Sequence, residues 1–330
     1  MRALKNCRQE SKGVIGKMKA LVGVTGFVGS NLFSEGKFDA AFHSQNIRDA
    51  YGLKPDLLVY AGLRAEKYLA NQFPDKDWGL ILQAQENIRK IAPAKLVLIS
   101  TIDVFQNPSG AYEDTAINDD GLQAYGRHRY LLECWARQNS PNALIVRLPG
   151  LFGRNIKKNF LYDMIHIIPS MLKPEKYQEL VQQDPRLGGF YSLQANGFYQ
   201  CRTLTEKEQK ALRGIMKHLG FTALNFTDHR SQFQFYPLKR LWKDIQTALE
   251  TNIPLVHLAT KPVSAGEVYQ YVTGGSFVNQ LDGKPAQYDF RTRHARNFGG
   301  HGEYLLEREE ALEEIRKFVR EETGGEDRWL

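Results

Sequence analysis

The chain has 330 residues, of which 42% are hydrophobic and 25% charged, and a formal net charge of +7. This composition is ordinary for a folded globular protein, and the length suffices for one large core or two associated domains. No apolar run is long enough to cross a bilayer, and the first residues lack the apolar stretch of a secretory signal, so we predict a cytoplasmic protein without a membrane partner.

The positive charge is concentrated at the start of the chain. Positions 1–19 carry a net charge of +5, which leaves about +2 for the rest of the sequence. We predict that residues 1–17 form a disordered basic tail and that Met18 begins the folded part. A polyanion-binding arm is the alternative interpretation of this tail, but the remaining sequence does not indicate a nucleic-acid-binding protein.

The cysteines and histidines show no metal-binding or disulfide pattern. Cys7, Cys134 and Cys201 are odd in number, widely spaced and outside any Cys-x-x-Cys motif. The histidines have no partner acids or cysteines at metal-ligand spacing. We therefore predict neither a disulfide framework nor a metal site.

The first predicted element is a buried strand, residues 20–24, that turns directly into a helix ending near Glu35. Gly23, Gly26 and Gly29 punctuate this turn at intervals of three residues. Such glycines permit a tight turn, a close approach of the backbone to phosphate oxygens, and close packing of helix on strand. Bare amides at the start of the following helix favour an anion, so the segment predicts a dinucleotide-binding corner.

Further apolar runs alternate with helical stretches along the first half of the chain. This alternation predicts an α/β fold with a Rossmann-type, doubly wound parallel sheet. A change to long mixed segments after Gly153 marks a second, smaller substrate-capping region. We predict strands at 40–42, 57–61, 95–100, 143–148 and 253–258, helices at 78–91 and 125–138, a dinucleotide-binding domain at 18–153 with a return at about 231–260, and a substrate-binding region at 154–230 and 261–330.

Two hydroxyl groups stand out beyond the glycine corner. Thr101 closes the predicted fourth strand, and Tyr125 opens a helix twenty-four residues later, with Arg129 one turn further on the same face. The carboxyl ends of strands are where open α/β sheets bind their ligands. Tyr125 as a packed aromatic on an amphipathic helix is the alternative interpretation.

Together these motifs resemble the extended short-chain dehydrogenase/reductase superfamily, in particular its NAD-dependent epimerase/dehydratase family of nucleotide-sugar enzymes. The resemblance rests on Thr25-Gly26-Phe27-Val28-Gly29, Ala61-Gly62-Leu63, Ser100-Thr101 with Val104-Phe105, Tyr125-Gly126, and Arg147-Leu148-Pro149-Gly150-Leu151-Phe152-Gly153. Beyond Gly153 it thins, and it carries no substrate residues over.

The resemblance implies NAD(P)-dependent oxidation-reduction, epimerisation or dehydration at a sugar carbon, on a nucleotide-linked sugar. Tyr125 would be the general acid/base, and Thr101 the hydroxyl that polarises the substrate oxygen. The family has lysine where this chain has Arg129, which keeps the positive charge that favours phenolate but cannot take part in a proton relay. A dinucleotide-binding regulatory or catalytically weak protein is therefore the alternative function, and a homodimer through the two long helices is also implied.

The implied cofactor is NADP or NAD. An acid at the end of the second strand often binds the adenosine ribose of NAD, but His43 and Ser44 stand there, with Arg48 following. The absence of a carboxylate favours NADP. The expected cofactor-binding residues are Gly23, Thr25, Gly26, Phe27, Val28, Gly29, His43, Ser44, Ala61, Gly62, Leu63, Tyr125, Arg129, Leu148 and Pro149, and the expected catalytic residues are Thr101, Tyr125 and Arg129.

Two charged groups stay open as site candidates. Arg64, Glu66 and Lys67 follow the third predicted strand and either border the ligands or form an exposed loop. A basic cluster around His294 either meets a diphosphate or is a solvated loop.

Overall fold

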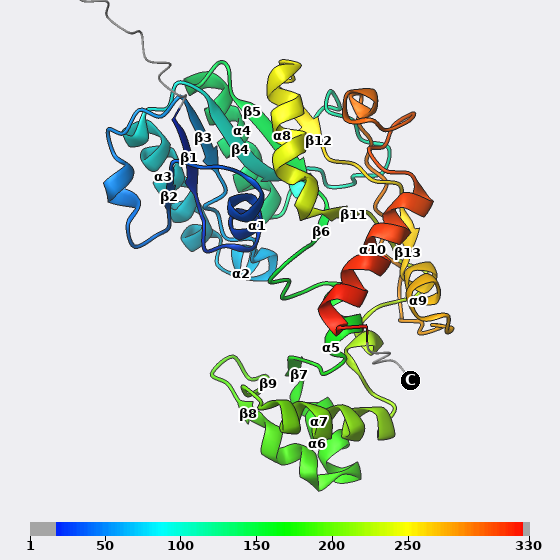
Figure 1. Ribbon diagram of the computed structural model, residues 1–330. Helices are drawn as coiled ribbons and strands as arrows, with labels where there is room; N and C mark the ends of the chain where they lie inside the picture. The colour runs from blue at the N-terminus through cyan, green and yellow to red at the C-terminus, as the bar shows by residue number, and fades with distance from the viewer. Residues whose placement is uncertain (1–17, 326–330) are drawn as a thin grey trace, which may run out of the picture.

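The computed structural model describes residues 18–325, so the predicted tail at 1–17 lies outside the described residues (Figure 1). Its main sheet has six parallel strands in the order β12-β5-β4-β3-β1-β2. The strands are β1 (Lys19–Val22), β2 (Ala40–Phe42), β3 (Leu57–Tyr60), β4 (Leu96–Thr101), β5 (Leu144–Leu148) and β12 (Leu255–His257). The chain passes from β1 outward to β2 and then back to β3 on the other side of β1. The predicted α/β, Rossmann-type class is confirmed.

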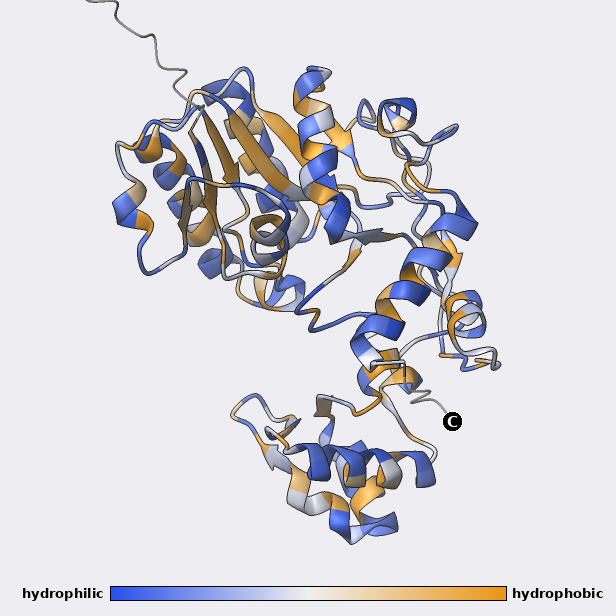
Figure 2. Ribbon diagram, viewed as in Figure 1, coloured by the Kyte–Doolittle hydropathy of each residue, from blue (hydrophilic) through white to orange (hydrophobic). Residues whose placement is uncertain are grey.

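Helices cover both faces of this sheet because successive strand residues point to opposite sides. Leu21 packs in one cluster with Leu32 of α1 (Phe27–Glu35) and Trp242 of α8 (Leu241–Glu250). Its neighbours on β1 pack on the other face, against Ile81 of α3 (Pro74–Ile91) and Leu132 of α4 (Ala124–Asn139). Figure 2 shows the apolar strands enclosed between helices whose polar residues face outward.

The later residues form short sheets and helices beside the main sheet. β6 (Gly150–Phe152) pairs with β11 (Phe235–Pro237), and β10 (Gln232–Phe233) pairs with β13 (Val263–Ser264). β7 (Met171–Leu172), β9 (Tyr199–Cys201) and β8 (Tyr191–Leu193) form an antiparallel sheet. With α6 (Pro174–Gln183) and α7 (Glu206–His218) this sheet makes a lobe that Figure 1 shows below the rest of the chain, joined through α5 (Phe160–His166).

The remaining helices are α2 (Lys67–Gln72), α9 (Ala265–Thr273) and α10 (Arg308–Thr323). The 3-10 segments are η1 (Ile47–Ala50), η2 (Ile102–Val104), η3 (Pro185–Phe190), η4 (Ala223–Phe226), η5 (Leu238–Arg240) and η6 (Ala295–Phe298). Among residues 18–325 no helix is long and apolar enough to span a membrane. Cys134 and Cys201 are free thiols.

A buried polar network joins α4 to three strands of the sheet. Glu133 of α4 is fully buried and accepts hydrogen bonds from Ser100 Oγ at 2.6 Å and from Arg147 Nη2 at 2.6 Å. Arg147 Nη1 lies 3.1 Å from Nε2 of His257, whose Nδ1 lies 2.8 Å from the carbonyl oxygen of Arg291. This pattern has Nδ1 of His257 donating and Nε2 accepting, so the imidazole is neutral.

A close backbone contact sets the start of α4 against η2. A Cβ on Gly126 would lie 2.0 Å from the carbonyl oxygen of Asp103. No side chain fits there, so the glycine after Tyr125 lets the helix approach the end of β4.

We expect Gly126→Ala to push α4 away from η2 and to destabilise the protein by about 1–3 kcal/mol, since the clashing atom is backbone. Gly79→Ala is the matched control, because Gly79 lies within α3 with no atom within 4 Å of its added Cβ. That control is expected to gain about 0.5–1 kcal/mol from helix propensity. Chemical denaturation measures both, and equal effects of the two substitutions would contradict the close packing.

The His257 imidazole predicts a pH-dependent stability. Burial, with a smaller contribution from the Arg147 charge, lowers the pKa of His257 to about 4, although Glu113 and the backbone bond to Arg291 act in the opposite direction. A histidine whose pKa is lower in the folded state stabilises the fold above its unfolded pKa of about 6.5. That contribution is lost as the pH falls from about 6.5 toward 4.

Urea unfolding at pH 7.5 and pH 5 is expected to show a loss of about 1–2 kcal/mol attributable to this group. His257→Gln removes the titrating ring and is expected to flatten this part of the profile. If His257→Gln has the same dependence of stability on pH as the starting protein, groups other than His257 cause that dependence.

Candidate active site

The glycine corner is built from contacts that side chains would prevent. Gly23 has φ +99°, and a Cβ on it would lie 2.4 Å from the carbonyl oxygen of Ala61. A Cβ on Gly29 would lie 2.0 Å from the carbonyl oxygen of Gly23, so α1 packs directly on the turn. A Cβ on Gly26 meets one atom, at 3.2 Å, and its backbone is extended. Gly23 and Gly29 thus serve the turn, whereas Gly26 leaves free space above it.

The N-terminus of α1 offers its amides to a ligand. No side chain caps the helix at Gly26, and the N–H of Ser30 is the first to bond back, to the Gly26 carbonyl at 2.8 Å. The first-turn N–H groups, those of Phe27, Val28 and Gly29, have no acceptor within the helix. Thr25 and Gly26 are exposed beside them. The corner therefore fits a dinucleotide diphosphate in charge and in space.

The other expected cofactor residues border this corner. His43 and Ser44 directly follow β2, where a hydrogen bond from His43 N–H to Asn46 Oδ1 at 2.8 Å closes a turn. No carboxylate stands at positions 43–48. Ala61, Gly62 and Leu63 follow β3, and Leu148 and Pro149 end β5, so all of them lie at the carboxyl edge of the sheet.

Thr101 and Tyr125 meet at this edge. The Tyr125 side chain forms a hydrogen bond with Thr101, although the two residues come from β4 and α4. Thr101 Oγ1 also accepts a hydrogen bond from the Asp103 N–H at 3.2 Å, which orients the hydroxyl group. Tyr125 N–H donates to Asn71 Oδ1 of α2 at 2.9 Å. The two predicted hydroxyls are thus brought together and braced.

Arg129 takes a different position from the one expected of a cofactor ligand. Its side chain is 4% exposed, and its guanidinium lies over the Tyr125 ring, 4.0 Å from the centroid. Nη1 forms an ion pair with Asp77 of α3, and Nη2 donates to the Arg64 carbonyl at 2.8 Å. These contacts hold the guanidinium inside the protein, between α3, α4 and the segment after β3.

The charges around Tyr125 oppose one another. Burial raises the pKa of Tyr125 above its usual value, and the carboxylate of Asp103 adds to the rise. The charge of Arg129, the hydrogen bond with Thr101 and the charge of Lys67 act in the opposite direction. The net direction is upward, so the chain's own groups do not produce the lowering toward neutrality that we expected from a nearby cation.

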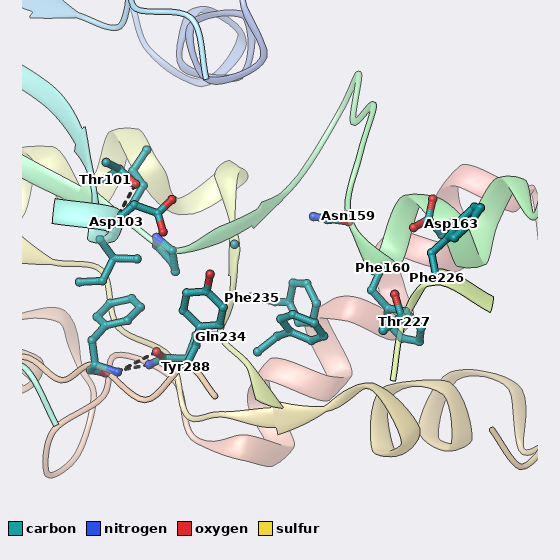
Figure 3. A pocket seen from close by; sticks show the side chains of 16 residues that line it. Thr101, Asp103, Asn159, Phe160, Asp163, Phe226, Thr227, Gln234, Phe235 and Tyr288 are labelled. Carbon is teal, nitrogen blue, oxygen red and sulfur yellow. Dashed lines mark hydrogen bonds between the residues drawn. The ribbon is translucent and has the colours of Figure 1, made fainter. Parts of the chain in front are cut away.

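A cavity of about 420 Å³ begins at Thr101 and Asp103 and extends away from the sheet. Figure 3 shows these two residues at one end and Asp163 and Phe226 at the other. Its wall is mainly apolar and aromatic, which is typical of a small-molecule site. The lining residues are Thr101, Ile102, Asp103, Leu148, Pro149, Gly150, Asn159, Phe160, Asp163, Phe226, Thr227, Phe233, Gln234, Phe235, Tyr288 and Phe290.

Two polar residues of the wall are held in place by the protein. Gln234 donates to the Thr260 carbonyl at 2.6 Å and accepts from the Phe290 N–H at 2.9 Å. Asn159 caps α5 through the N–H groups of the first turn. Asp163 differs, because burial raises the pKa of its carboxyl to about 7. Near neutral pH this group can both donate and accept a hydrogen bond.

Sequence reasoning did not assign Asp103, Asp163 or Tyr288 to the site, and it left Lys67 as an open candidate. Asp103 stands two residues after Thr101, the only signal that could have placed it. Tyr288 and Asp163 lie far along the chain in segments without a motif. The basic residues near His294 pair within the fold: Arg291 with Glu303 at 3.0 Å and Arg293 with Asp114 at 3.5 Å.

The described residues contain no arrangement of three or more His, Cys, Asp or Glu side chains suited to a metal ion.

Comparison with known proteins places the site in a family context. Residues 21–174 match the family model of the RmlD substrate binding domain. A comparison with curated protein sequences gives no significant match.

Solved structures share the fold over nearly the whole chain. The dTDP-4-dehydrorhamnose reductase of Bacillus anthracis, in complex with NADP, is 16% identical with a TM-score of 0.58 over 92% of this chain and 99% of that one. The Bordetella bronchiseptica enzyme WbmG, in complex with NAD and UDP, is 12% identical with a TM-score of 0.59, over 94% and 95%. The UDP-glucose 4-epimerase of Thermotoga maritima is 12% identical with a TM-score of 0.56, over 92% and 99%.

At these identities the structural likeness concerns the fold. Together with the match of residues 21–174 to the RmlD substrate binding domain model, it confirms the resemblance stated from the sequence: the chain has the fold of the extended short-chain dehydrogenases/reductases that include nucleotide-sugar reductases and epimerases.

Proposed function

We propose that this protein is an NADP-dependent oxidoreductase that acts on a carbonyl or hydroxyl carbon of a nucleotide-linked sugar. The observation that carries the proposal is the contact of Tyr125 with Thr101, which lines one end of a cavity, at the sheet edge that bears the glycine corner. Residues 18–153 with α8 and β12 would bind the dinucleotide, and the later residues the sugar. A homodimer through α3 and α4 is part of the proposal.

Reduction of a ketone is the reaction we favour, because the similar Bacillus anthracis structure is named a dTDP-4-dehydrorhamnose reductase and was solved in complex with NADP. Epimerisation or dehydration would use the same hydroxyl groups. NADP is favoured over NAD because His43 and Ser44 bring no carboxylate that would repel a 2′-phosphate.

We assign each residue of the site a role in binding or in proton transfer. A bound nicotinamide supplies or accepts a hydride at the sugar carbon. The amides at the start of α1 bind the diphosphate. Thr101 holds the substrate oxygen. The Tyr125 phenol donates a proton to that oxygen in reduction, and the Tyr125 phenolate accepts the proton in oxidation. Arg129 stays in the protein, where its charge over the ring favours the phenolate.

The first prediction concerns the cofactor. Gly26→Val is expected to lower NADPH affinity at least tenfold, because the side chain fills the space above the first-turn amides while the extended backbone tolerates it. Fluorescence titration with NADPH measures the effect, and melting temperature tests the fold. Ser34→Val, on the exposed last turn of α1, is the control. Unchanged affinity in Gly26→Val would exclude this corner as the binding site.

The second prediction concerns the chemistry. A screen of nucleotide sugars and their keto forms, read by NADPH absorbance and by product analysis, is expected to identify a substrate. Tyr125→Phe is then expected to lower turnover by roughly 100-fold or more while leaving NADPH binding within a few fold. Turnover that persists unchanged in Tyr125→Phe would refute the assigned mechanism.

A dinucleotide-binding protein without turnover is the second candidate. Arg129 favours it, because its terminal nitrogens are committed to Asp77 and Arg64 and the family's lysine is missing. Tight NADPH binding with no product across the screen would select this candidate.

A further inference from the structure

We propose that Lys67, paired with Asp103, is a positioning residue that sets the charge beside the Tyr125 hydroxyl. This inference rests on the proposed role of Tyr125 and deepens it, since it names a residue from another segment of the chain.

The contacts of α2 place Lys67 at the site. Lys67 is the first residue of α2, and its Nζ lies 2.8 Å from Asp103 Oδ1. Asn71, one turn later on the same face of this helix, accepts the hydrogen bond from the Tyr125 N–H. One face of α2 therefore contacts both Asp103 of η2 and the start of α4.

The environment of Lys67 keeps its ammonium group charged and in contact with solvent. Its side chain is 47% exposed, whereas that of Arg129 is 4% exposed. Burial acts to lower the pKa of Lys67, but the charge of Asp103 and the hydrogen bond to it outweigh that effect, with Tyr288 and Tyr125 adding to the rise. Lys67 thus stays charged, and its ammonium group reaches solvent.

The charges that face Tyr125 come from three elements. Asp103 of η2 opposes the phenolate, and Lys67 of α2 and Arg129 of α4 favour it. The charge of Arg129 is balanced by Asp77 at its other side. Tyr288, which lines the cavity, responds to the same two charges: Asp103 raises its pKa and Lys67 lowers it.

Lys158 completes the surroundings. Burial lowers its pKa, although Glu66 and Asp103 act to raise it, and its Nζ donates to the Ala65 carbonyl two residues before Lys67. Lys67 is therefore the cation that directly compensates Asp103, and without it the uncompensated carboxylate would raise the pKa of Tyr125 further.

The test measures Tyr125 itself in the full-length protein. Replacing Tyr125 with 3,5-difluorotyrosine lowers the intrinsic pKa of the phenol. Its ionisation can then be followed by ¹⁹F NMR without substrate. Lys67→Met is expected to move this titration to higher pH, and Asp103→Asn to lower pH. The double variant is expected to titrate close to the starting protein, and Lys67→Arg, which keeps the charge, likewise.

Lys95→Met is the matched control, because Lys95 precedes β4 at the opposite edge of the sheet. It is expected to leave the titration unchanged. A Tyr125 titration that is unaffected by Lys67→Met, or shifted equally by Lys95→Met, would overturn the inference. Circular dichroism confirms folding of each variant.

A second measurement uses turnover once a substrate is known. In the direction in which Tyr125 acts as a base, Lys67→Met is expected to reduce the rate at pH 7 by about threefold, with recovery in the double variant. The ¹⁹F titration does not depend on turnover. If the screen yields no product, the proposed function is refuted. The titration still decides whether Lys67 sets the charge beside Tyr125.

Discussion

The buried ion pair between Glu133 and Arg147 is the interaction on which the candidate site depends. Both side chains are at most 1% exposed, and a charge left there without its partner would cost several kcal/mol. Glu133 lies on the helix that begins with Tyr125, and it also binds Ser100, the neighbour of Thr101. Because β4, β5 and α4 are held by one charged cluster, the two hydroxyl groups that face each other at the sheet edge are positioned from within the core rather than by surface loops.

The same helix carries a second buried charge, and this one changes the chemistry. Arg129 is fixed by Asp77 and by carbonyl groups, so its guanidinium contributes a positive field to the Tyr125 ring from a fixed position inside the protein. A lysine at that position would combine the field with a mobile ammonium group. Here the two tasks are separated. The field comes from Arg129, and a solvent-accessible ammonium comes from Lys67 through Asp103.

The sequence predicted the parts of the fold that depend on local pattern. The apolar runs of the six sheet strands lie within about two residues of the observed strands, and the glycine corner and the hydroxyl pair are where the motifs placed them. The lobe of α6, α7 and the three-stranded sheet was not predicted. Asn196-Gly197 between β8 and β9 is a hairpin-turn signal, but strands of two or three residues are too short to show an alternating pattern. The partners of Arg129 could not be predicted either. Asp77 is 52 residues away, and no local spacing reports a contact between two helices.

The cavity explains why the sequence predicts the dinucleotide-binding residues but not the substrate-binding residues. Diphosphate binding needs backbone amides and missing Cβ atoms, which leave glycines at fixed intervals. Selecting a sugar needs side chains brought together from distant segments, such as Asp103 from η2, Asp163 from α5 and Tyr288 from the loop before η6. A carboxyl with a pKa raised to about 7 at one end, and an ion-paired carboxylate at the other, give the two ends of one apolar cavity different hydrogen-bonding character. Discrimination between substrates then follows from which end a polar group must face, because an unpaired polar group in such a wall is costly to bury.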